Sequence, residues 1–344
     1  MPAVGKQPKV RQPVLWFDIP LYAAIVLLVA AVLDYLIGDP WGWPHPVRVM
    51  GWFISRFTEF AFKHFNQSLL LRWAGVVLGV GLVTGSGMVG WLIVYGLNWL
   101  HPLLSITVES VILASCFAGR SLRASAQEVL QPLSSGQIAV ARSTLSLYVG
   151  RDTEDLSEAE ILRAVLETVT ENATDGVMAP LFYAIAGAAI PVVGSVPLAL
   201  AYKAASTLDS MVGYREVPYT DLGSFSARLE DLLTWLPCRL TVMTLALLSH
   251  KPRYIWRICC RDAIKDKSPN SGWSECAYAA ALGVQVGGTN WYHSVAKHKP
   301  LLGDPLHPIT PAKIYDALQL TRYCFLIWLG VAFCLLSAYA FATS

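Results

Sequence analysis

Long runs of hydrophobic residues alternate with polar stretches along this chain. Two of the runs, 74–99 and 323–342, contain no formally charged residue. Each supplies the roughly twenty residues that a helix needs to cross the hydrocarbon core of a bilayer, so we predict that both span a membrane. Small residues at four-residue spacing allow helices to approach closely in lipid. The first run has such a set: Gly75, Gly79, Gly81, Gly85, Gly87 and Gly90.

Other apolar segments are interrupted by charged or helix-breaking residues. Short or interrupted segments are often re-entrant or buried rather than spanning. We therefore predict four to seven membrane-embedded segments in total and treat 177–193 as re-entrant. The interrupted segments are 20–37 with Asp34, 102–117 with Glu109, 177–193 with Pro180, Gly187 and Pro191, and 232–248 with Pro237 and Arg239.

Polar, helix-forming stretches separate the apolar segments. The stretch 120–149 predicts two amphipathic helices, and 157–172 predicts a helix that begins with a capping box of Ser157 and Glu160. The stretch 251–322 has ten Lys or Arg residues against five Asp or Glu, which places it on the cytoplasmic side of a membrane. No segment keeps a strand-like alternation for long.

These patterns indicate an all-α fold, a polytopic helical membrane protein with re-entrant or broken helices and amphipathic cytoplasmic helices. We treat residues 1–344 as one domain and expect it to cross the cell (plasma) membrane several times. Hydrophobic residues make up 54% of the chain and charged residues 15%, which supports this class. The net charge of +2 gives no argument for nucleic acid. The seven cysteines lack metal-ligand or redox spacing, so we interpret them as small hydrophobic residues.

The stretch 202–215 places ionisable residues in one of the most apolar parts of the chain. It contains Lys203, Asp209 and Arg215, together with Tyr214 and several hydroxyl groups. Charged groups near lipid are costly and usually mark a functional site. Lys203 and Asp209 are six residues apart and therefore lie on different faces of a helix. A buried salt bridge to another helix is the structural alternative.

Arg163, Glu167, Glu171 and Asp175 recur every four residues and would share one face of a helix. The polar turn that begins at Asn172 leads from this helix directly into an apolar segment. Carboxylates gathered there suit Mg²⁺, which takes one or two carboxylates plus phosphate oxygens and water. One of them suits a general base equally well. The alternative is a surface ladder of Arg–Glu pairs.

A polar cluster follows the first apolar segment. Gly38 and Pro40 force an irregular turn, and Asp39, His45 and Arg48 lie on or just beyond it. This pattern suits an anion or metal site at the edge of the membrane. A polar helix terminus beside interfacial aromatic residues explains it equally well.

Two further patterns suggest phosphate binding. Arg228, Asp231 and Arg239 recur along one helical stripe, and arginines in such a stripe bind phosphate or carboxylate through paired hydrogen bonds. Pairing of Arg228 with Asp231 inside the helix is the alternative. Asn270 lies in a turn that opens a helix rich in small residues, which we expect to end near 287–288. The free N–H groups of a helix start can hold a phosphate, although tight helix packing also explains the alanines.

Together these residues resemble the CobD/CbiB family, the integral membrane adenosylcobinamide-phosphate synthases of cobalamin biosynthesis. The matching blocks occur in family order and cover residues 33–305. Each block alone is weak evidence for the resemblance, but the complete set is specific to the family. The blocks are Gly38-Asp39-Pro40 with His45-Pro46-Val47-Arg48, Val149 to Thr153, Glu171 to Gly176 with Ala179 to Phe182, Tyr202 to Arg215, Ala227 to Asp231, Pro269 to Trp273 and Gly283 to Gly288.

The resemblance implies a ligase that uses ATP and Mg²⁺ to form an amide. The bond would join a propionate of adenosylcobyric acid, a corrinoid, to the amine of (R)-1-amino-2-propanol O-phosphate or a related amino alcohol phosphate. The chain has no P-loop, so ATP would be held without a common phosphate-binding loop. The implied partners are these small molecules and the lipid bilayer, with no nucleic acid. Other membrane enzymes of cobalamin assembly and a second copy of the chain stay open as partners.

Within that reaction we assign candidate roles by residue type, and we expect the site to face the cytoplasm. The catalytic candidates are Glu171, Asp175, Lys203 and Asp209, of which the three carboxylates are also candidate Mg²⁺ ligands. The candidates for binding substrate or phosphate are His45, Arg48, Asn172, Tyr214, Arg215, Arg228, Asp231 and Asn270.

The chain departs from the family pattern at three positions. Ser206 and Thr234 stand where the family usually has asparagine, and Glu230 stands where it usually has aspartate. These departures keep a non-catalytic assembly or regulatory relative open. A corrinoid-binding transporter is the other alternative, because transporters also use broken helices with embedded charges.

Overall fold

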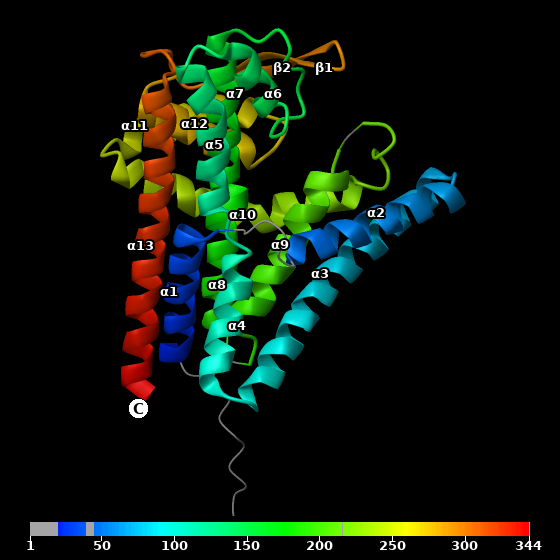
Figure 1. The fold of residues 1–344 in the computed structure, drawn as a ribbon, viewed down its shortest axis with the longest axis vertical. Helices are drawn as coiled ribbons and strands as arrows, with labels where there is room; N and C mark the ends of the chain where they lie inside the picture. Colours follow the sequence, from blue (N-terminus) through cyan, green and yellow to red (C-terminus); the bar gives the residue numbers. More distant parts are fainter. Residues whose placement is uncertain (1–19, 39–44, 191, 215, 344) are drawn as a thin grey trace, which may run out of the picture.

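The computed structural model of the chain describes residues 20–38, 45–190, 192–214 and 216–343. Helices follow one another along most of it, and one β-hairpin lies near the end (Figure 1). The strands are β1 (Val286–Tyr292) and β2 (Val295–Leu302). The helices are α1 (Pro20–Leu36), α2 (Pro46–His64), α3 (Ser68–Asn98), α4 (Pro102–Ala114), α5 (Gly119–Ser134), α6 (Ile138–Leu145), α7 (Glu158–Asn172), the π-helix η2 (Ala173–Met178), α8 (Ala179–Ala188), α9 (Ser195–Val212), α10 (Ser224–Leu248), α11 (Pro252–Asp262), the short 3₁₀-helix η3 (Ala263–Lys265), α12 (Ser271–Leu282) and α13 (Pro311–Thr343).

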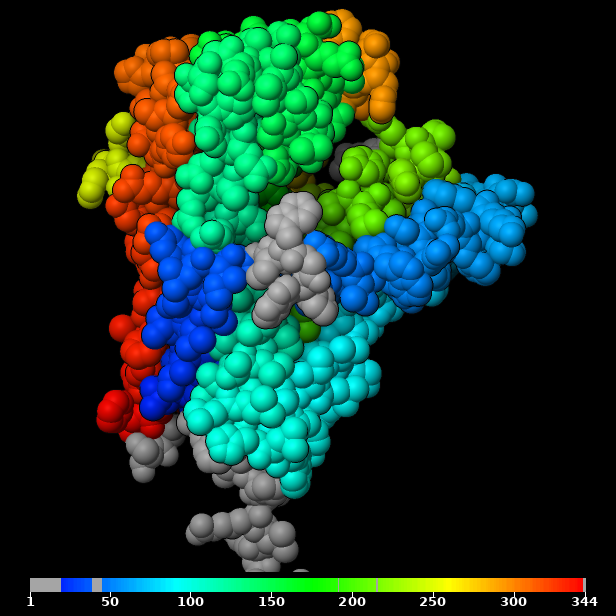
Figure 2. Space-filling view, in the orientation of Figure 1, coloured from blue at the N-terminus to red at the C-terminus, as the bar shows by residue number. Residues whose placement is uncertain are grey.

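Apolar helices form the lower part of the molecule in Figure 1, where α1, α4 and the lower parts of α3 and α13 gather. Figure 2 shows α1 lying against α13 along one edge. The spanning helices predicted over 74–99 and 323–342 are confirmed as parts of α3 and α13. In the described part of the chain, four helical stretches are long and apolar enough to cross a membrane: Ser68–Asn98, Pro102–Ser134, Ser224–Leu248 and Pro311–Ala342.

Glycines in α3 bring this helix close to its neighbours, as their spacing predicts. A Cβ atom on Gly75 would lie 2.0 Å from the carbonyl oxygen of Leu222, and one on Gly90 would lie 2.8 Å from a methyl carbon of Leu200. Real Cβ atoms do not come so close. The backbone contact at Gly75 therefore requires glycine, whereas at Gly90 the Leu200 side chain would have to shift. α3 therefore packs tightly on α9 and on the connection before α10, which fixes the position of both helices.

The helix that begins at α7 is broken rather than regular. It continues through η2 into α8, and α8 then packs beside α9 as a helical hairpin whose turn lies in the lower half of Figure 1. With ten residues, α8 is too short to cross a bilayer core alone. A Cβ atom on Gly187 would lie 2.2 Å from the Gly194 carbonyl oxygen, so glycine permits the tight turn. This broken hairpin agrees with the interrupted segment predicted over 177–193.

The polar part of the molecule lies above these helices in Figure 1 and contains α5, α6, α7, α11, α12 and the hairpin. The capping box at the start of α7 is confirmed, because Ser157 and Glu160 each accept from the other's backbone N–H. The two amphipathic helices predicted within 120–149 are α5 and α6. These elements anchor one end of α7 in the polar part.

The antiparallel hairpin β1–β2 corrects one prediction. The helix expected to end near 287–288 ends at Leu282, and Gly283 closes it in the left-handed region with φ of 69°. Gly287 and Gly288 belong to β1 instead, with φ values of 92° and 102° that interrupt regular pleating. The turn at His293 and Ser294 also has positive φ angles but lacks the Asn-Gly sequence that usually reveals such a turn. The hairpin therefore carries a weak sequence signal.

Candidate active site

Five carboxylates from four helical elements lie close enough to interact electrostatically. Glu171 is in the last turn of α7, Asp175 in η2, Asp209 near the end of α9, and Glu230 and Asp231 in α10. We call this set the carboxylate cluster. Burial raises the pKa of Asp175 well above its usual value, and the charges of the four other carboxylates raise it further. Like charges gathered in this way favour binding of a cation or a proton.

The π-helix η2 places Asp175 in this cluster. A π-helix widens one helical turn, and such turns often occur at functional sites. Neighbouring groups contact the wider turn: the backbone N–H of Ala118 donates to the Gly176 carbonyl oxygen at 3.0 Å, and the side-chain hydroxyls of Thr174 and Ser274 bond at 2.8 Å. These contacts stabilise the irregular turn.

A buried chain of hydroxyl groups supports Glu230. Tyr202 bonds through its hydroxyl to the Thr234 hydroxyl at 2.8 Å, and Thr234 donates to the Glu230 carboxylate. The ring of Tyr183 stacks on that of Tyr202, with 4.9 Å between centroids. Thr234, one of the departures from the family pattern, therefore still fixes a polar side chain of the cluster.

The turn before α12 is tied to α10. Asn270 is buried, and its side-chain amide donates to the Asp231 carbonyl oxygen at 2.8 Å. Among the described residues, the Oδ1 atom of Asn270 is buried without a hydrogen-bond partner. Arg239 donates to the Pro269 carbonyl oxygen at 2.9 Å and lies 4.3 Å from the ring centroid of Trp273. Arg239 thus helps to hold the turn in place.

Arg228 remains available for a ligand. It is exposed on α10, and in the described part of the chain it forms no ion pair with Asp231 or any other carboxylate. The intrahelical pairing considered as an alternative is therefore wrong. Lys203 is partly buried on α9, about 1.7 turns before Asp209, so the two side chains leave the helix on different sides as predicted.

The stripe on α7 divides into two parts with different surroundings. Glu171 and Asp175 belong to the carboxylate cluster, whereas Arg163 and Glu167 bind the hairpin. Glu167 is buried, accepts from the Gly287 backbone N–H at 2.8 Å and pairs with Arg151 at 2.5 Å. The surface-ladder alternative is therefore wrong.

A second ion pair links the hairpin to α12. Lys299 of β2 lies 2.5 Å from the fully buried Glu275. Burial opposes the charge on Lys299, but Glu275 and then Glu171 and Glu167 raise its pKa above the usual value. We call Arg151–Glu167 and Lys299–Glu275 the hairpin ion pairs. Lys299 also lies close enough to Glu171 of the carboxylate cluster to interact with it electrostatically.

The residues that support the site have little or no signal in the sequence. Glu230 had one signal, its position next to Asp231 in a block that matches the family. Glu275 lies at the end of the turn sequence that contains Asn270, but residue type alone did not single it out. Arg151 lies in the matching block Val149 to Thr153, but its pairing with Glu167 had no signal. Lys299 had no signal, because only the hairpin brings it to α12.

Other predicted site residues lie at the edge of this region or have local roles. Asn172 is exposed, and its amide donates to the Thr168 carbonyl oxygen. Tyr214 is exposed and donates to the Ser210 carbonyl oxygen. His45 caps the start of α2 by accepting from the Val47 N–H, and Arg48 is exposed one turn further on. α2 packs against α9, which brings this segment toward the end of α9. Asp39, Pro40 and Arg215 lie outside the described residues.

The carboxylate cluster is not a ready-made metal cage. In the ranges that the structure describes, no three or more His, Cys, Asp or Glu residues are arranged to hold a metal ion on their own. Mg²⁺, however, usually takes only one or two carboxylates and completes its shell with phosphate oxygens and water. The donor set therefore suits a Mg²⁺ ion that arrives with a phosphate-bearing ligand.

Comparison with known proteins gives a consistent result. A protein-family model described as CobD/Cbib protein matches residues 27–321. Cobalamin biosynthesis protein CobD of Synechocystis sp. is 54% identical over 307 residues, which cover 89% of this chain and 90% of the relative. Cobalamin biosynthesis protein CobD of Geobacter metallireducens is 43% identical over 291 residues, 83% of this chain and 88% of the relative. Cobalamin biosynthesis protein CbiB of Salmonella typhimurium is 41% identical over 296 residues, 85% and 91% of the two chains. No solved structure matches the chain.

Proposed function

Because this chain belongs to the CobD/CbiB family, we propose that it acts as an adenosylcobinamide-phosphate synthase, a ligase that forms a carbon–nitrogen bond. The substrates would be adenosylcobyric acid, ATP and (R)-1-amino-2-propanol O-phosphate or a related amino alcohol phosphate. A carboxylate is a poor electrophile, so we propose that ATP first converts the propionate to an acyl phosphate and releases ADP. The amine then attacks the acyl carbon, and inorganic phosphate leaves as the amide forms.

The carboxylate cluster is the observation that carries this proposal. The reaction brings together several phosphate groups and requires an amine to lose a proton. Mg²⁺ would neutralise phosphate charge as it develops. Glu171, Asp175 and Asp209 are the carboxylates that we assign to hold it. Asp175 is alternatively the acceptor of the proton from the attacking amine, because burial and neighbouring carboxylates raise its pKa and so its affinity for a proton.

Positive groups around the cluster would bind the phosphates and the carboxylate of the substrates. We assign this role to Lys203 and Arg228, with His45 and Arg48 at the start of α2. We also assign it to Arg215, from its sequence position alone, because Arg215 lies outside the described residues. The buried amide oxygen of Asn270 is a spare acceptor for a substrate N–H or O–H group. Asp231 would act through its backbone bond to Asn270.

We also propose that the site faces the cytoplasm across the cell membrane. The positively charged stretch 251–322 forms α11, α12, the hairpin and the first part of α13, which lie with the polar part of the molecule. The positive-inside rule assigns such a stretch to the cytoplasmic face. This orientation gives the carboxylate cluster access to ATP in the cytosol.

The test is a synthase assay on the purified, detergent-solubilised full chain with both substrates, Mg²⁺ and ATP, in which mass spectrometry follows the corrinoid. We expect a mass gain of one amide condensation that requires ATP, and its loss in Asp209→Asn. Glu59→Gln, an exposed carboxylate on α2, is the matched control and should keep full activity. An unmodified corrinoid with the folded wild-type protein would contradict the proposal. Net movement of unmodified corrinoid across liposomes would support a transporter instead.

A further inference from the structure

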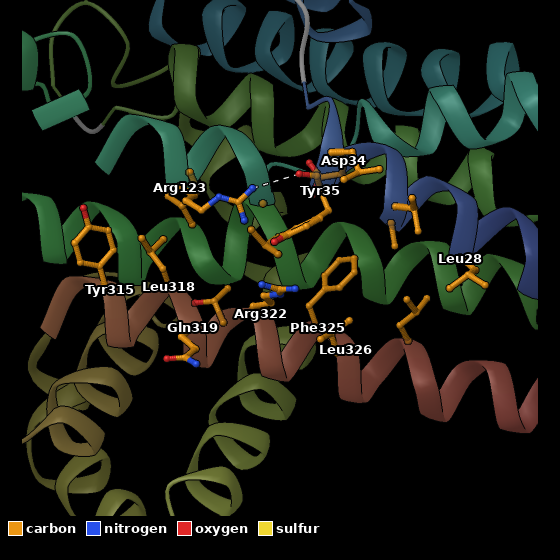
Figure 3. Close-up of a pocket in the computed structure, with 18 residues that line it drawn as sticks. Leu28, Asp34, Tyr35, Arg123, Tyr315, Leu318, Gln319, Arg322, Phe325 and Leu326 are labelled. Carbon is orange, nitrogen blue, oxygen red and sulfur yellow. Dashed lines mark hydrogen bonds between the residues drawn. The ribbon is translucent and has the colours of Figure 1, made fainter. Parts of the chain in front are cut away.

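A cavity of about 450 Å³ opens on the side of the molecule where α1, α5 and α13 meet (Figure 3). The carboxylate cluster does not line it. We call this cavity the arginine pocket, after two arginines in its wall. Residues that define it include Leu28 and Tyr35 of α1, Arg123 of α5, and Leu318, Arg322 and Leu326 of α13.

The polar end of the arginine pocket carries positive charge. Arg123 and Arg322 both lie over the ring of Tyr35, at 4.8 and 4.4 Å from its centroid (Figure 3). In the described part of the chain, no carboxylate forms an ion pair with either guanidinium. Asp34, the one acidic residue in the wall, accepts from the Arg120 backbone N–H at the start of α5. The wall of the pocket therefore contains two guanidinium groups and one carboxylate, and this carboxylate is engaged with a helix start.

The other end of the pocket is aliphatic and open to the surroundings. Leu28 and Val32 of α1 are 46% and 47% exposed, and Leu326 of α13 is 48% exposed. All three line the cavity. They belong to apolar helices, so in a bilayer these side chains face acyl chains rather than water.

The two ends meet at the level where a bilayer changes from headgroups to hydrocarbon. Arg322 immediately precedes the uncharged run 323–342 of α13, and Tyr35 lies in the last turn of α1. Arginine and tyrosine at the ends of membrane helices place their polar groups at the interface. The pocket is thus positive at headgroup depth and aliphatic below it.

We propose that the arginine pocket binds one anionic phospholipid. Its phosphate would lie between Arg123 and Arg322, and an acyl chain would follow the aliphatic groove between α1 and α13. Basic pockets between membrane helices hold acidic lipid headgroups for the same electrostatic reason. The aliphatic half favours a lipid over a soluble phosphate compound, and the excess positive charge favours an anionic lipid over a zwitterionic one.

The test is lipid binding by the purified full chain in detergent, followed by native mass spectrometry and by thermal unfolding. Phosphatidylglycerol is compared with phosphatidylcholine of identical acyl chains and with water-soluble glycerol phosphate. We expect one tightly bound phosphatidylglycerol and a higher Tm with this lipid than with the other two. Equal effects of the two lipids would overturn the proposal, and so would an equal effect of glycerol phosphate, which would indicate a site for a soluble phosphate.

Substitutions in the arginine pocket test whether phosphatidylglycerol binds there. Each of Arg123→Gln and Arg322→Gln should weaken phosphatidylglycerol binding about fivefold, the effect of one basic residue at a lipid surface. Val32→Trp should block the groove with both arginines intact, and because Val32 is exposed this variant avoids the core. Arg56→Gln, an exposed arginine on α2, is the matched control. Full lipid preference in both Arg322→Gln and Val32→Trp would contradict the assignment.

Discussion

Glu167 and Asp175 lie eight residues apart on one continuous helical stretch, yet their surroundings push their pKa values in opposite directions. Burial opposes ionisation of Glu167, but Arg151 and Lys299 outweigh it and lower its pKa. Burial and four neighbouring carboxylates raise the pKa of Asp175. The fold supplies the partner of Glu167 and surrounds Asp175 with like charge. We infer that Glu167 stabilises the structure, whereas the like charges of the carboxylate cluster favour binding of a cation or a proton.

Asp175→Asn tests the inferred role of Asp175 in the carboxylate cluster and should have the largest effect of the variants described here. The synthase rate should fall at least about 100-fold, the usual contribution of a general base. The free energy of unfolding should rise at neutral pH, because the variant removes like-charge repulsion. The rate is measured by product mass, and stability by Tm in the same detergent. Asp155→Asn, in the exposed loop before α7, is the control. Full activity of Asp175→Asn would remove this residue from the site.

Arg151→Met tests the inference that Glu167 stabilises the structure through its pair with Arg151. Removal of one partner of a buried ion pair destabilises a protein by about 3–5 kcal/mol, because the other charge stays buried. The Tm should therefore fall strongly, while the synthase rate per folded molecule should change little. Arg56→Met, which breaks the exposed pair with Glu59, is the matched control and should change stability by less than about 1 kcal/mol. A small effect of Arg151→Met on Tm would contradict the structural role.

The pH dependence of stability distinguishes the contribution of Asp175 from that of Glu167. The raised pKa of Asp175 gives stability that is full below its unfolded value near 3.8 and is lost as pH rises through the folded pKa. The lowered pKa of Glu167 gives stability that is present above 4.5 and is lost as pH falls through the folded pKa. Without Mg²⁺ and ATP, the Tm advantage of Asp175→Asn over wild type should therefore grow from pH 4 to pH 8. A constant difference would contradict the raised pKa.

Tyr202→Phe tests the support of the cluster and should have the smallest effect. The variant removes the hydroxyl that bonds to Thr234, and one such bond contributes about 1 kcal/mol. The stacking on Tyr183 stays in place. We expect a modest fall in Tm and a severalfold fall in kcat with little change in KM. An unchanged kcat would show that the hydroxyl chain does not position Glu230.

Much of the fold follows from local pattern. The uncharged runs predict α3 and α13 because only a helix satisfies its own backbone in lipid. The capping box predicts the start of α7. The hairpin escapes prediction because its glycines and its positive-φ turn interrupt strand alternation. The π-helix η2 escapes as well, because contacts from Ala118 and Ser274 support it and these residues are distant in sequence.

Some residues of the candidate site can likewise be predicted from local sequence, and others cannot. Glu171, Asp175, Asp209 and Asp231 are predictable because charge beside apolar sequence is costly and therefore informative. Lys299 and Glu275 meet across 24 residues, and only the hairpin brings them together. The arginine pocket joins α1, α5 and α13, so no local pattern reveals that Arg123 and Arg322 share one tyrosine.

The most direct test of the account follows oxygen in the proposed synthase reaction. Adenosylcobyric acid labelled with ¹⁸O in the propionate carboxylate is incubated with the purified chain, ATP, Mg²⁺ and aminopropanol phosphate. Activation through an acyl phosphate predicts that the corrinoid gains the amide while one labelled oxygen appears in the released inorganic phosphate. An unmodified corrinoid with folded protein would contradict the proposed function. Amide product with no label in phosphate would contradict the proposed activation step.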